Sequence, residues 1–536
     1  MNQSKNLWRI LTIGLLCVTL LVLFPFVLGI NFSGLGDLFS NGLFLSTLQT
    51  TLLNALISAA ILVVFGFSGA LLLLKNPSFS FIGKNLGLLI IPITLGNISI
   101  AFICKLIWGD SSFFSGIAQG GQFNKLGFLL LLELYQFGLL FVYLFWMQLQ
   151  NINADRLNFA IATKFSFYQK LKDIYLPHTR NLWLLLAAIS FVFAFYEESK
   201  IAYLFKVSQG TNSELITNWL TRNYQTNLLV NPDFARNQVF DASAFVLVAA
   251  IAGLILLFLV LYYFIKKFTA VKLYPTNQPT RKGSYPLKKT GWFFGLLFCT
   301  VAILPLILSL TKVSFSFNFS QLGFPLLMTF IATFASSATA IFFGIASRLG
   351  WKQTLSSFSQ KSLPFFVLLF VLLLVPPMVI LITGFKWMSL VGYSSQSIIY
   401  TIWIIGHILL TLPVLGSFVL FNHFRVSNNE IDYLQVYKLG KAETIRYSFF
   451  KRFKAEYLLL FIIGYSFIWN EAVLNNLFSD YIPSFVSGMK MLITGRGADY
   501  DKAFGYLLVS FIVALLSAVI WRYIIEKAQK QLNTEV

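Results

Sequence analysis

The stretch DRLNFAIATKFSFYQKLKDIYLP, residues 155–177, is a polar and basic interval between two long apolar segments. At helical spacing its apolar residues form one stripe: Leu157, Ala160, Ile161, Phe165, Tyr168, Leu171 and Ile174. Its basic residues fall mostly off that stripe: Arg156, Lys164, Lys170 and Lys172. A proline opposes continuation of a helix through the residues before it, so Pro177 is expected to end the helix. The sequence therefore predicts a short amphipathic helix within a polar loop.

The composition of the chain is that of an integral membrane protein. Hydrophobic residues make up 57% of the chain, charged residues 11%, and the mean hydropathy is +0.75, which is outside the range of soluble domains. A helix crosses the hydrocarbon core with about 20 apolar residues. Twelve such runs can be counted: 7–30, 48–74, 85–108, 126–149, 181–205, 244–265, 292–311, 325–348, 363–387, 397–421, 455–478 and 503–525. The sequence predicts an all-α protein with about twelve transmembrane helices.

The basic residues predict the orientation of these helices. Lys and Arg concentrate in every second loop, including 150–180, 266–289 and 422–454, and cytoplasmic loops carry this excess. Both termini and the amphipathic helix are then expected in the cytoplasm. The net charge of +20 is explained by this placement and requires no nucleic acid partner. The first run, 7–30, is longer than the apolar part of a signal peptide and is expected to remain as a span.

Residues 266–291 divide the chain into two halves. This segment carries prolines, a glycine and seven Lys and Arg, which is typical of a flexible cytoplasmic linker. Six apolar runs lie on each side of it, so residues 1–265 and 292–536 are expected to be two pseudo-symmetric units. A basic loop falls between the fourth and fifth runs of both halves, which indicates a duplication.

The stretch 155–177 resembles the EAA loop of binding-protein-dependent ABC importer permeases, whose pattern is roughly E-A-A-x-x-x-G-A-S-x-x-Q-x-F-x-x-I-x-L-P. Six residues match the pattern in register: Ala160, Ser166, Gln169, Ile174, Leu176 and Pro177. Five positions depart from it: Asn158 stands for the glutamate, Phe159 for the first alanine, Lys164 for the glycine, Phe165 for the following alanine and Leu171 for the phenylalanine.

A second copy, LQVYKLGKAETIRYSFFKRF, occupies residues 434–453. Gly440 keeps the glycine of the pattern, while Leu434, Ala442 and Phe453 replace the glutamate, serine and proline. In the family, this loop forms the coupling helix that docks into a groove of the cytoplasmic ATPase. The resemblance therefore implies two docking points with these coupling residues: Asn158, Ala160, Lys164, Ser166, Tyr168, Gln169, Leu176, Pro177, Leu434, Tyr437, Gly440 and Ala442.

The resemblance implies the permease subunit of an ABC importer, with two fused transmembrane units as in the permeases of ferric-iron and thiamine uptake. Such a chain lies in the inner membrane of a bacterium and works with two cytoplasmic ATPase subunits and an extracytoplasmic solute-binding protein. Its substrate is expected to be ferric iron, thiamine or another small polar solute. The chain has no GxxxxGK[ST] phosphate loop, so ATP is expected on the partner subunits and the chain itself is not an enzyme. With three cysteines, three histidines and no Cys/His cluster, no metal or other cofactor is expected on this chain.

Ionisable residues within spans are costly and are functional candidates for that reason. FYEESKIAYLF, residues 195–205, can be laid over IWNEAVLNNLF, residues 468–478. This pairs Glu197 with Asn470 and Glu198 with Glu471, and together with Asn97 these residues are candidates for the translocation path. The alternative is that each carboxylate pairs with a neighbouring lysine or backbone group, with Lys200 as the partner of Glu197.

Three further ionisable residues lie in apolar runs. Glu133 and Lys105 could form an intramembrane ion pair, although a lysine near the end of a span can also reach the interface. His407 stands alone in its run, and a satisfied core histidine is favoured there over a ligand.

Two other functions remain open. A secondary carrier driven by an ion gradient would share the twelve spans in two halves. Such carriers commonly show a charged Gly/Asp/Arg motif between the second and third spans, where this chain has KNPSFSFIGKN at 75–85. A membrane-embedded enzyme acting on lipid or glycan would need a polar catalytic cluster, and the sequence pattern does not indicate one.

Overall fold

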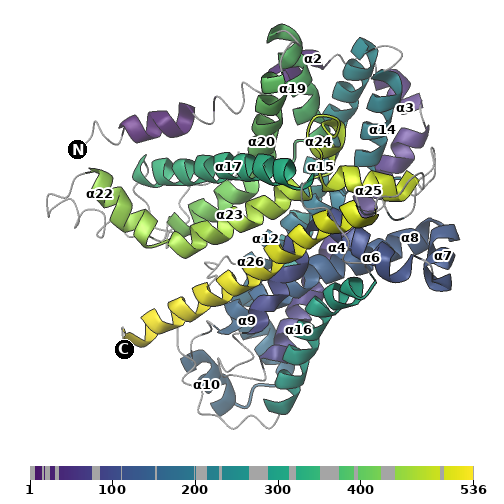
Figure 1. Ribbon diagram of the computed structural model, residues 1–536. Coiled ribbons are helices and arrows are strands. Elements are labelled where there is room, and N and C mark those ends of the chain that lie inside the picture. The colour runs from purple at the N-terminus through teal and green to yellow at the C-terminus, as the bar shows by residue number, and fades with distance from the viewer. Residues whose placement is uncertain are drawn as a thin grey trace. The chain divides into compact units, whose positions relative to one another are not determined.

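The computed structural model describes most of the chain: 6–14, 17, 24–30, 35–40, 42–74, 85–109, 111–150, 152, 154–197, 200, 204, 214–228, 232–264, 288–312, 321–350, 373–391, 396–423, 426, 441–494 and 500–534. Every element in these ranges is helical (Figure 1). The all-α fold is thus confirmed for the described residues.

Eight described helices are long and apolar enough to cross a membrane: Gly42–Leu73, Leu86–Trp108, Asn124–Gln150, Gln238–Leu257, Thr290–Leu310, Gly323–Gly350, Gln396–Leu420 and Ala503–Lys527. A ninth is added if Phe167–Arg180 and Leu182–Phe195, which meet at a bend of 60°, form one span. The chain therefore has the character of a multi-pass membrane protein. The expected runs 7–30 and 363–387 lie partly outside the described residues. The count of twelve remains a prediction.

The chain forms two compact units, each drawn from both halves of the sequence. Unit 1 comprises Met1–Leu45, Ile216–Val248 and Ser316–Leu507, and unit 2 comprises Ser46–Leu215, Ala249–Phe315 and Leu508–Val536. Three long helices run from one unit into the other along the chain: α4 (Gly42–Leu73), α15 (Pro232–Phe264) and α26 (Tyr500–Thr534). Of the predicted linker 266–291, residues 266–287 lie outside the described ranges, whereas residues 288–291 belong to the first turn of the helix α16 (Lys288–Leu310). The division of the chain into two repeats remains a prediction.

Unit 2 packs the apolar helices of the first half closely. Besides its share of the three long helices it contains η2 (Leu86–Ile90), α6 (Ile91–Trp108), α7 (Ser112–Gln119), α8 (Gln122–Glu133), the π-helix η3 (Leu134–Gly138), α9 (Leu139–Gln150), α10 (Ala154–Ala162), α11 (Phe167–Lys170), the π-helix η4 (Leu171–Tyr175), α12 (Leu176–Phe195) and α16 (Lys288–Leu310). A Cβ atom added at Gly66 of α4 would come within 2.6 Å of the Phe141 side chain on α9. Small residues permit such an approach of two helices in a membrane protein.

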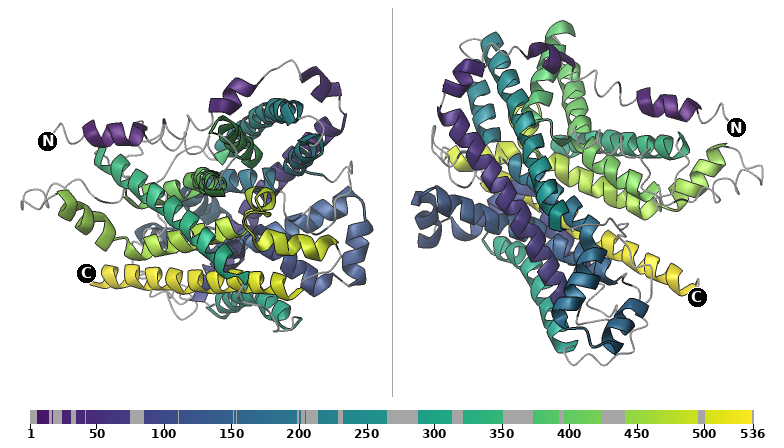
Figure 2. Two further views of the ribbon diagram at one scale, coloured as in Figure 1. Left: turned by 45° about the horizontal axis from the view of Figure 1, so that its top comes forward. Right: turned by 180° about the vertical axis from the view of Figure 1, so that it is seen from behind.

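Unit 1 is organised around a helix trio from the second half. Its elements are α2 (Phe24–Gly29), α3 (Leu35–Ser40), α14 (Ile216–Leu228), α17 (Gly323–Gly350), α19 (Pro377–Val391), α20 (Gln396–His423), α22 (Lys441–Ile445), the π-helix η6 (Arg446–Lys451), α23 (Lys454–Trp469), α24 (Val473–Leu477) and α25 (Phe485–Thr494). Helix α17 packs against both α20 and α23 and lies beside α23 in Figures 1 and 2. A Cβ atom at Gly344 would meet Val419 and His423 of α20, so glycine allows this packing.

Candidate functional site

The two predicted coupling stretches are called the first coupling segment, residues 155–177, and the second coupling segment, residues 434–453. The first coupling segment consists of two helices where the sequence predicted one. Helix α10 ends at Ala162 and α11 begins at Phe167. Between them Lys164 has a backbone φ of 54°, in the left-handed region that glycine adopts without strain. Lys164 stands at the glycine position of the EAA pattern. A left-handed backbone at this position would explain why the pattern has glycine there. The expectation of one continuous amphipathic helix was wrong, because the chain stops and restarts at this residue.

A capping box starts the second helix of the segment. The Ser166 hydroxyl accepts the backbone N–H of Gln169 at 3.2 Å, and the Gln169 side-chain oxygen accepts the backbone N–H of Ser166 at 2.8 Å. Each side chain thereby satisfies a backbone donor that a helix start would leave unpaired. The serine and glutamine of the EAA pattern are spaced three residues apart, as this reciprocal bonding requires.

The helix does not end at Pro177, contrary to the prediction. Helix α11 passes through η4 into α12, and Pro177 lies in the first turn of α12. A proline is tolerated in a first turn because the N–H that it lacks is not needed there. The backbone N–H of Leu176 bonds the carbonyl of Leu171, which is the π-helical pattern. The coupling segment is therefore joined to the following apolar helix by helical structure that bends by 60° between Arg180 and Leu182.

The outer surface of the first segment is both apolar and basic. Four large apolar side chains are more than half exposed: Phe159, Ile161, Phe167 and Tyr168. Of the expected coupling residues, Asn158, Lys164, Ser166, Tyr168, Gln169 and Pro177 are exposed, Leu176 is partly buried and Ala160 is buried. Of the residues on the predicted apolar stripe, Leu157, Ala160 and Ile174 are buried, whereas Ile161 and Tyr168 are exposed. Clustered exposed apolar side chains are typical of a protein-contact surface.

The second segment repeats part of this construction. A short helix, α22, runs into a π-helix, η6, and the apolar helix α23 follows. Ala442 is exposed on α22, whereas the expected coupling residues Leu434, Tyr437 and Gly440 lie outside the described residues. The exposed aromatic residues are Tyr447 and Phe450, and the Lys451 ammonium lies 4.0 Å from the centre of the Tyr447 ring.

A buried cluster anchors the second segment to the helix trio of unit 1. Ile345, Val426, Phe449 and Phe453 form an apolar core beneath η6. Arg348, at the end of α17 and fully buried, donates from Nε and Nη2 to the Val426 carbonyl at 3.2 and 2.6 Å. Val426, which precedes α22 in the chain, and Phe449 of η6, which follows it, therefore both pack at the end of α17.

The fifth apolar run of the first half is broken at Glu197. Helix α12 ends at Phe195, and the Glu197 carboxylate accepts the backbone N–H of Lys200 at 2.8 Å and its ammonium at 3.0 Å. It also accepts the Asn97 amide at 3.0 Å. The structure thus brings together the predicted residues Asn97 and Glu197, and the predicted pairing with Lys200 is confirmed. Glu198 lies outside the described residues.

Asn97 reaches Glu197 because its own helix is interrupted. Gly96, within α6, has φ 74° and ψ 168°, which is outside helical geometry and accessible mainly to glycine. The third and fifth apolar runs of this half are therefore both broken where their polar side chains meet.

Glu133 belongs to the same buried cluster in unit 2. Its side chain is buried, and Lys200, Ser58 and Glu197 are the polar groups that act on it. Lys105 is not among them, so of the two possibilities that the sequence left open for Lys105, the structure does not show the ion pair with Glu133. Lys200 is too distant in sequence from Glu133 for spacing alone to indicate this electrostatic interaction.

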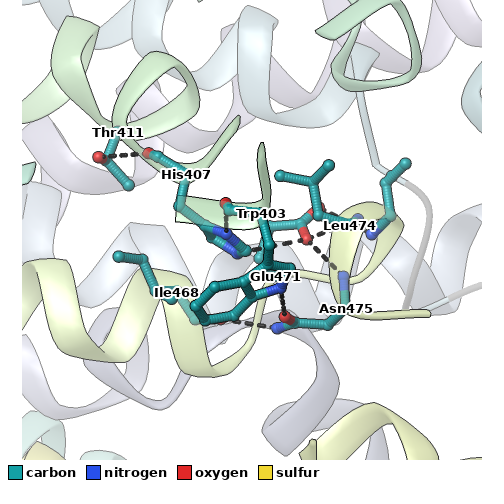
Figure 3. A network of polar contacts seen from close by, with 8 residues as sticks. Trp403, His407, Thr411, Ile468, Glu471, Leu474 and Asn475 are labelled. Carbon is teal, nitrogen blue, oxygen red and sulfur yellow. Dashed lines mark hydrogen bonds and ion pairs between the residues drawn. The ribbon is translucent and has the colours of Figure 1, made fainter. Parts of the chain in front are cut away.

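The second half has a matching break, which Figure 3 shows from close by. Helix α23 ends at Trp469, and the Glu471 carboxylate accepts the backbone N–H groups of Val473, Leu474 and Asn475 at 2.7, 2.8 and 3.2 Å. Asn470 is buried and donates its amide to the Ser466 carbonyl at 2.9 Å.

Two residues of the fourth run complete this network. The Trp403 indole donates to Asn475 Oδ1 at 3.2 Å, and His407 Nε2 lies 3.9 Å from Glu471 Oε2 (Figure 3). His407 was expected to be a satisfied core residue, yet its Nε2 atom has no hydrogen-bond partner among the described residues.

The structural match between the halves differs by one residue from the sequence overlay. Glu197 and Glu471 each lie two residues after the last residue of a helix and cap the N–H three residues further on. Glu197 therefore corresponds to Glu471, whereas the overlay paired Glu471 with Glu198. The sequence contains a signal for this correspondence, because the number of residues from Glu133 to Glu197 equals the number from His407 to Glu471.

No family model matches the chain, and no curated protein matches it.

Proposed function

We propose that the chain is the permease subunit of a binding-protein-dependent ABC importer, with two fused transmembrane units. The observation that carries this proposal is the first coupling segment. Its left-handed Lys164, its Ser166–Gln169 capping box and its continuity with α12 give a physical reason for three features of the EAA pattern. The second segment supports the proposal because it repeats the order of short helix, π-helix and apolar helix.

In this proposal the exposed aromatic side chains of each segment dock into a groove of a cytoplasmic ATPase subunit. Phe167 and Tyr168 serve the first contact, and Tyr447 and Phe450 serve the second. ATP is bound and hydrolysed by two ATPase subunits, and an extracytoplasmic binding protein delivers the solute. The chain lies in a bacterial inner membrane with both termini in the cytoplasm.

Movement of a docked segment is passed to the translocation path through helical structure. From α11 the backbone continues through η4 and α12 to the break at Glu197, and from η6 the chain reaches the break at Glu471 through α23. A change of tilt at the cytoplasmic end of either helix therefore displaces a capped carboxylate at its other end. Closure of the ATPase subunits thereby shifts both helices and opens the path to one side of the membrane or the other, which is alternating access.

The path residues in this proposal are Asn97, Glu197, Glu198, Asn470 and Glu471. The substrate is ferric iron, thiamine or another small polar solute. The carboxylates favour a solute that is cationic or donates hydrogen bonds.

A secondary carrier driven by an ion gradient is the second candidate. The observation that favours it is the Glu133 carboxylate, which is buried within an apolar helix beside Ser58 and Lys200. Buried carboxyl groups of this kind serve as proton relays in gradient-driven transporters.

One experiment separates the two candidates. The chain is purified alone into lipid vesicles, and uptake of iron(III) and of thiamine is measured under a proton gradient and under a sodium gradient. In parallel, the chain is purified with the ATPase subunits of its native host, and vanadate-sensitive ATP hydrolysis is measured. The importer proposal predicts no accumulation by the chain alone and ATP hydrolysis by the complex. Accumulation driven by either gradient would establish the carrier instead.

A further inference from the structure

The fourth and fifth apolar runs carry an ionisable residue at the same place in each half. In unit 2 these residues are Glu133 and Glu197, and in unit 1 they are His407 and Glu471. Each fifth-run carboxylate caps the N–H of the residue three positions later, which is Lys200 in unit 2 and Leu474 in unit 1. Lys200 and Leu474 therefore occupy corresponding positions next to the two carboxylates.

In unit 2, Lys200 supplies a tethered cation to this place. Its side chain is fully buried, and its ammonium lies 3.0 Å from Glu197 Oε2. The ammonium also lies 5.7 Å from the centre of the Phe137 ring, in the π-helix that follows Glu133. One lysine thus bridges the fifth-run carboxylate and the fourth-run helix, and it offsets the cost of burying that carboxylate.

In unit 1 the corresponding side chain brings no charge. Leu474 packs towards Gly406, so that a Cβ atom there would lie 3.0 Å from Leu474 Cδ1. Within the described part of the chain, the polar partners of Glu471 are three backbone N–H groups and the His407 ring. No described lysine or arginine pairs with this carboxylate.

The orientation of His407 leaves two acceptors facing each other. Its Nδ1 atom lies 2.8 Å from the Trp403 carbonyl, which can only accept, so Nδ1 carries the hydrogen. In the neutral ring, Nε2 is then an acceptor. Nε2 is buried without a hydrogen-bond partner among the described residues and lies 3.9 Å from Glu471 Oε2. Two acceptors directed at one place call for a donor with more than one hydrogen.

We propose that Glu471 and His407 bind a primary ammonium group from outside the chain, in the place that the Lys200 ammonium fills in unit 2. The ammonium donates one hydrogen to the Glu471 carboxylate and another to His407 Nε2. Glu471 keeps 14% of its side chain exposed, which gives a ligand access to the carboxylate. Trp403 holds the imidazole in place, since its ring centre is 4.2 Å from that of His407.

The test uses the purified full chain and methylammonium chloride as the probe. Tetramethylammonium chloride has the same charge but no N–H group, and it serves as the matched control ligand. Equilibrium binding of radiolabelled methylammonium is measured, together with the shift in Tm that a bound ligand causes. We expect saturable binding of one methylammonium per chain that tetramethylammonium does not displace. No saturable binding, or equal displacement by both salts, would overturn the proposal.

Three variants locate the site. Glu471→Gln removes the charge at nearly constant size and is expected to weaken methylammonium binding at least tenfold. Leu474→Lys recreates the tethered ammonium of unit 2 and is expected to abolish binding while raising the Tm of the ligand-free protein. Asp480→Asn, at an exposed carboxylate of the same segment, is the control and is expected to bind as the native chain does.

Native-like binding by Glu471→Gln would place the site elsewhere and refute the proposal, as would an equal loss in Asp480→Asn. If Leu474→Lys does not fold, the comparison of Glu471→Gln with Asp480→Asn still shows whether Glu471 belongs to the binding site. The measurements need no ATPase partner, so this inference and the importer proposal can fail separately.

Discussion

Lys164 occupies a backbone conformation that costs an L-residue about 1–2 kcal/mol relative to the right-handed region. Lys164→Gly is therefore expected to make the first coupling segment more stable by about 1 kcal/mol. Lys164→Val is expected to make it less stable, because a β-branched side chain fits this conformation poorly. Hydrogen exchange of the amides in α10 and α11 measures both changes. Equal exchange in the two variants would show that the stability of the first coupling segment does not depend on a left-handed conformation at this residue.

Lys200 forms an ion pair with the buried Glu197 and interacts electrostatically with the buried Glu133. Lys200→Met keeps most of the side-chain volume but leaves Glu197 and Glu133 without that cation. Removing one partner of a buried ion pair costs about 3–5 kcal/mol, so a large fall in Tm is expected. Lys105→Met is the matched control, because Lys105 is half-buried in α6 and does not act on Glu133. A Tm for Lys200→Met as high as that of the control would contradict this assignment.

Arg348 is expected to hold the chain before the second coupling segment. Arg348→Met removes the two donors of the Val426 carbonyl, and an unsatisfied buried acceptor costs about 1–3 kcal/mol. We expect faster hydrogen exchange in α22 and η6 and unchanged exchange in α10 and α11, which provide the internal control. Faster exchange in both segments to the same extent would indicate general destabilisation and would refute the local role.

Among the elements, the two coupling segments are the proposed contacts with the ATPase. Phe167 and Tyr168 together present the largest exposed aromatic surface of the first segment. Aromatic side chains at the centre of an interface commonly carry about 2 kcal/mol or more of binding energy each. The double substitution of both residues by alanine is therefore expected to lower the ATP hydrolysis of the complex at least tenfold, with membrane insertion unchanged.

The control for that double substitution is Phe334→Ala. Phe334 is similarly exposed, but it lies within the apolar helix α17 and not in a coupling segment. We expect this variant to hydrolyse ATP at the native rate. Native hydrolysis by the double variant would exclude the first segment as a coupling point.

The elements also show why the sequence predicted the first segment only in part. Apolar spacing predicted helical structure there and placed Leu157, Ala160 and Ile174, which are buried, on one stripe. It could not reveal the restart at Lys164, because a left-handed lysine has no signal in periodicity. It misjudged Pro177, because a proline in the first turn of a new helix has the same local sequence as one that ends a helix.

At the scale of the whole molecule, composition was sufficient to predict an all-α membrane protein, since long apolar runs have few alternatives. The interactions around Glu133 and Glu197 could not be predicted from the sequence to the same extent. Their partners lie on helices far apart in the sequence, and spacing along the chain does not encode which faces meet. The match of Glu197 with Glu471 required the helix ends, which a sequence overlay places only to within a residue or two.

An ATPase that holds this chain at both coupling segments can be detected by cysteine cross-linking in native-host membranes. Cys17, Cys104 and Cys299 are first replaced, and a single cysteine is then introduced as Tyr168→Cys, Ala442→Cys or, as the control on the exposed surface of the apolar helix α17, Phe334→Cys. Products formed with a short bifunctional maleimide are identified by mass spectrometry. We expect the first two variants to cross-link to an ABC ATPase and the control not to do so. Freely reactive cysteines at Tyr168 and Ala442 that cross-link to no ATPase would contradict it.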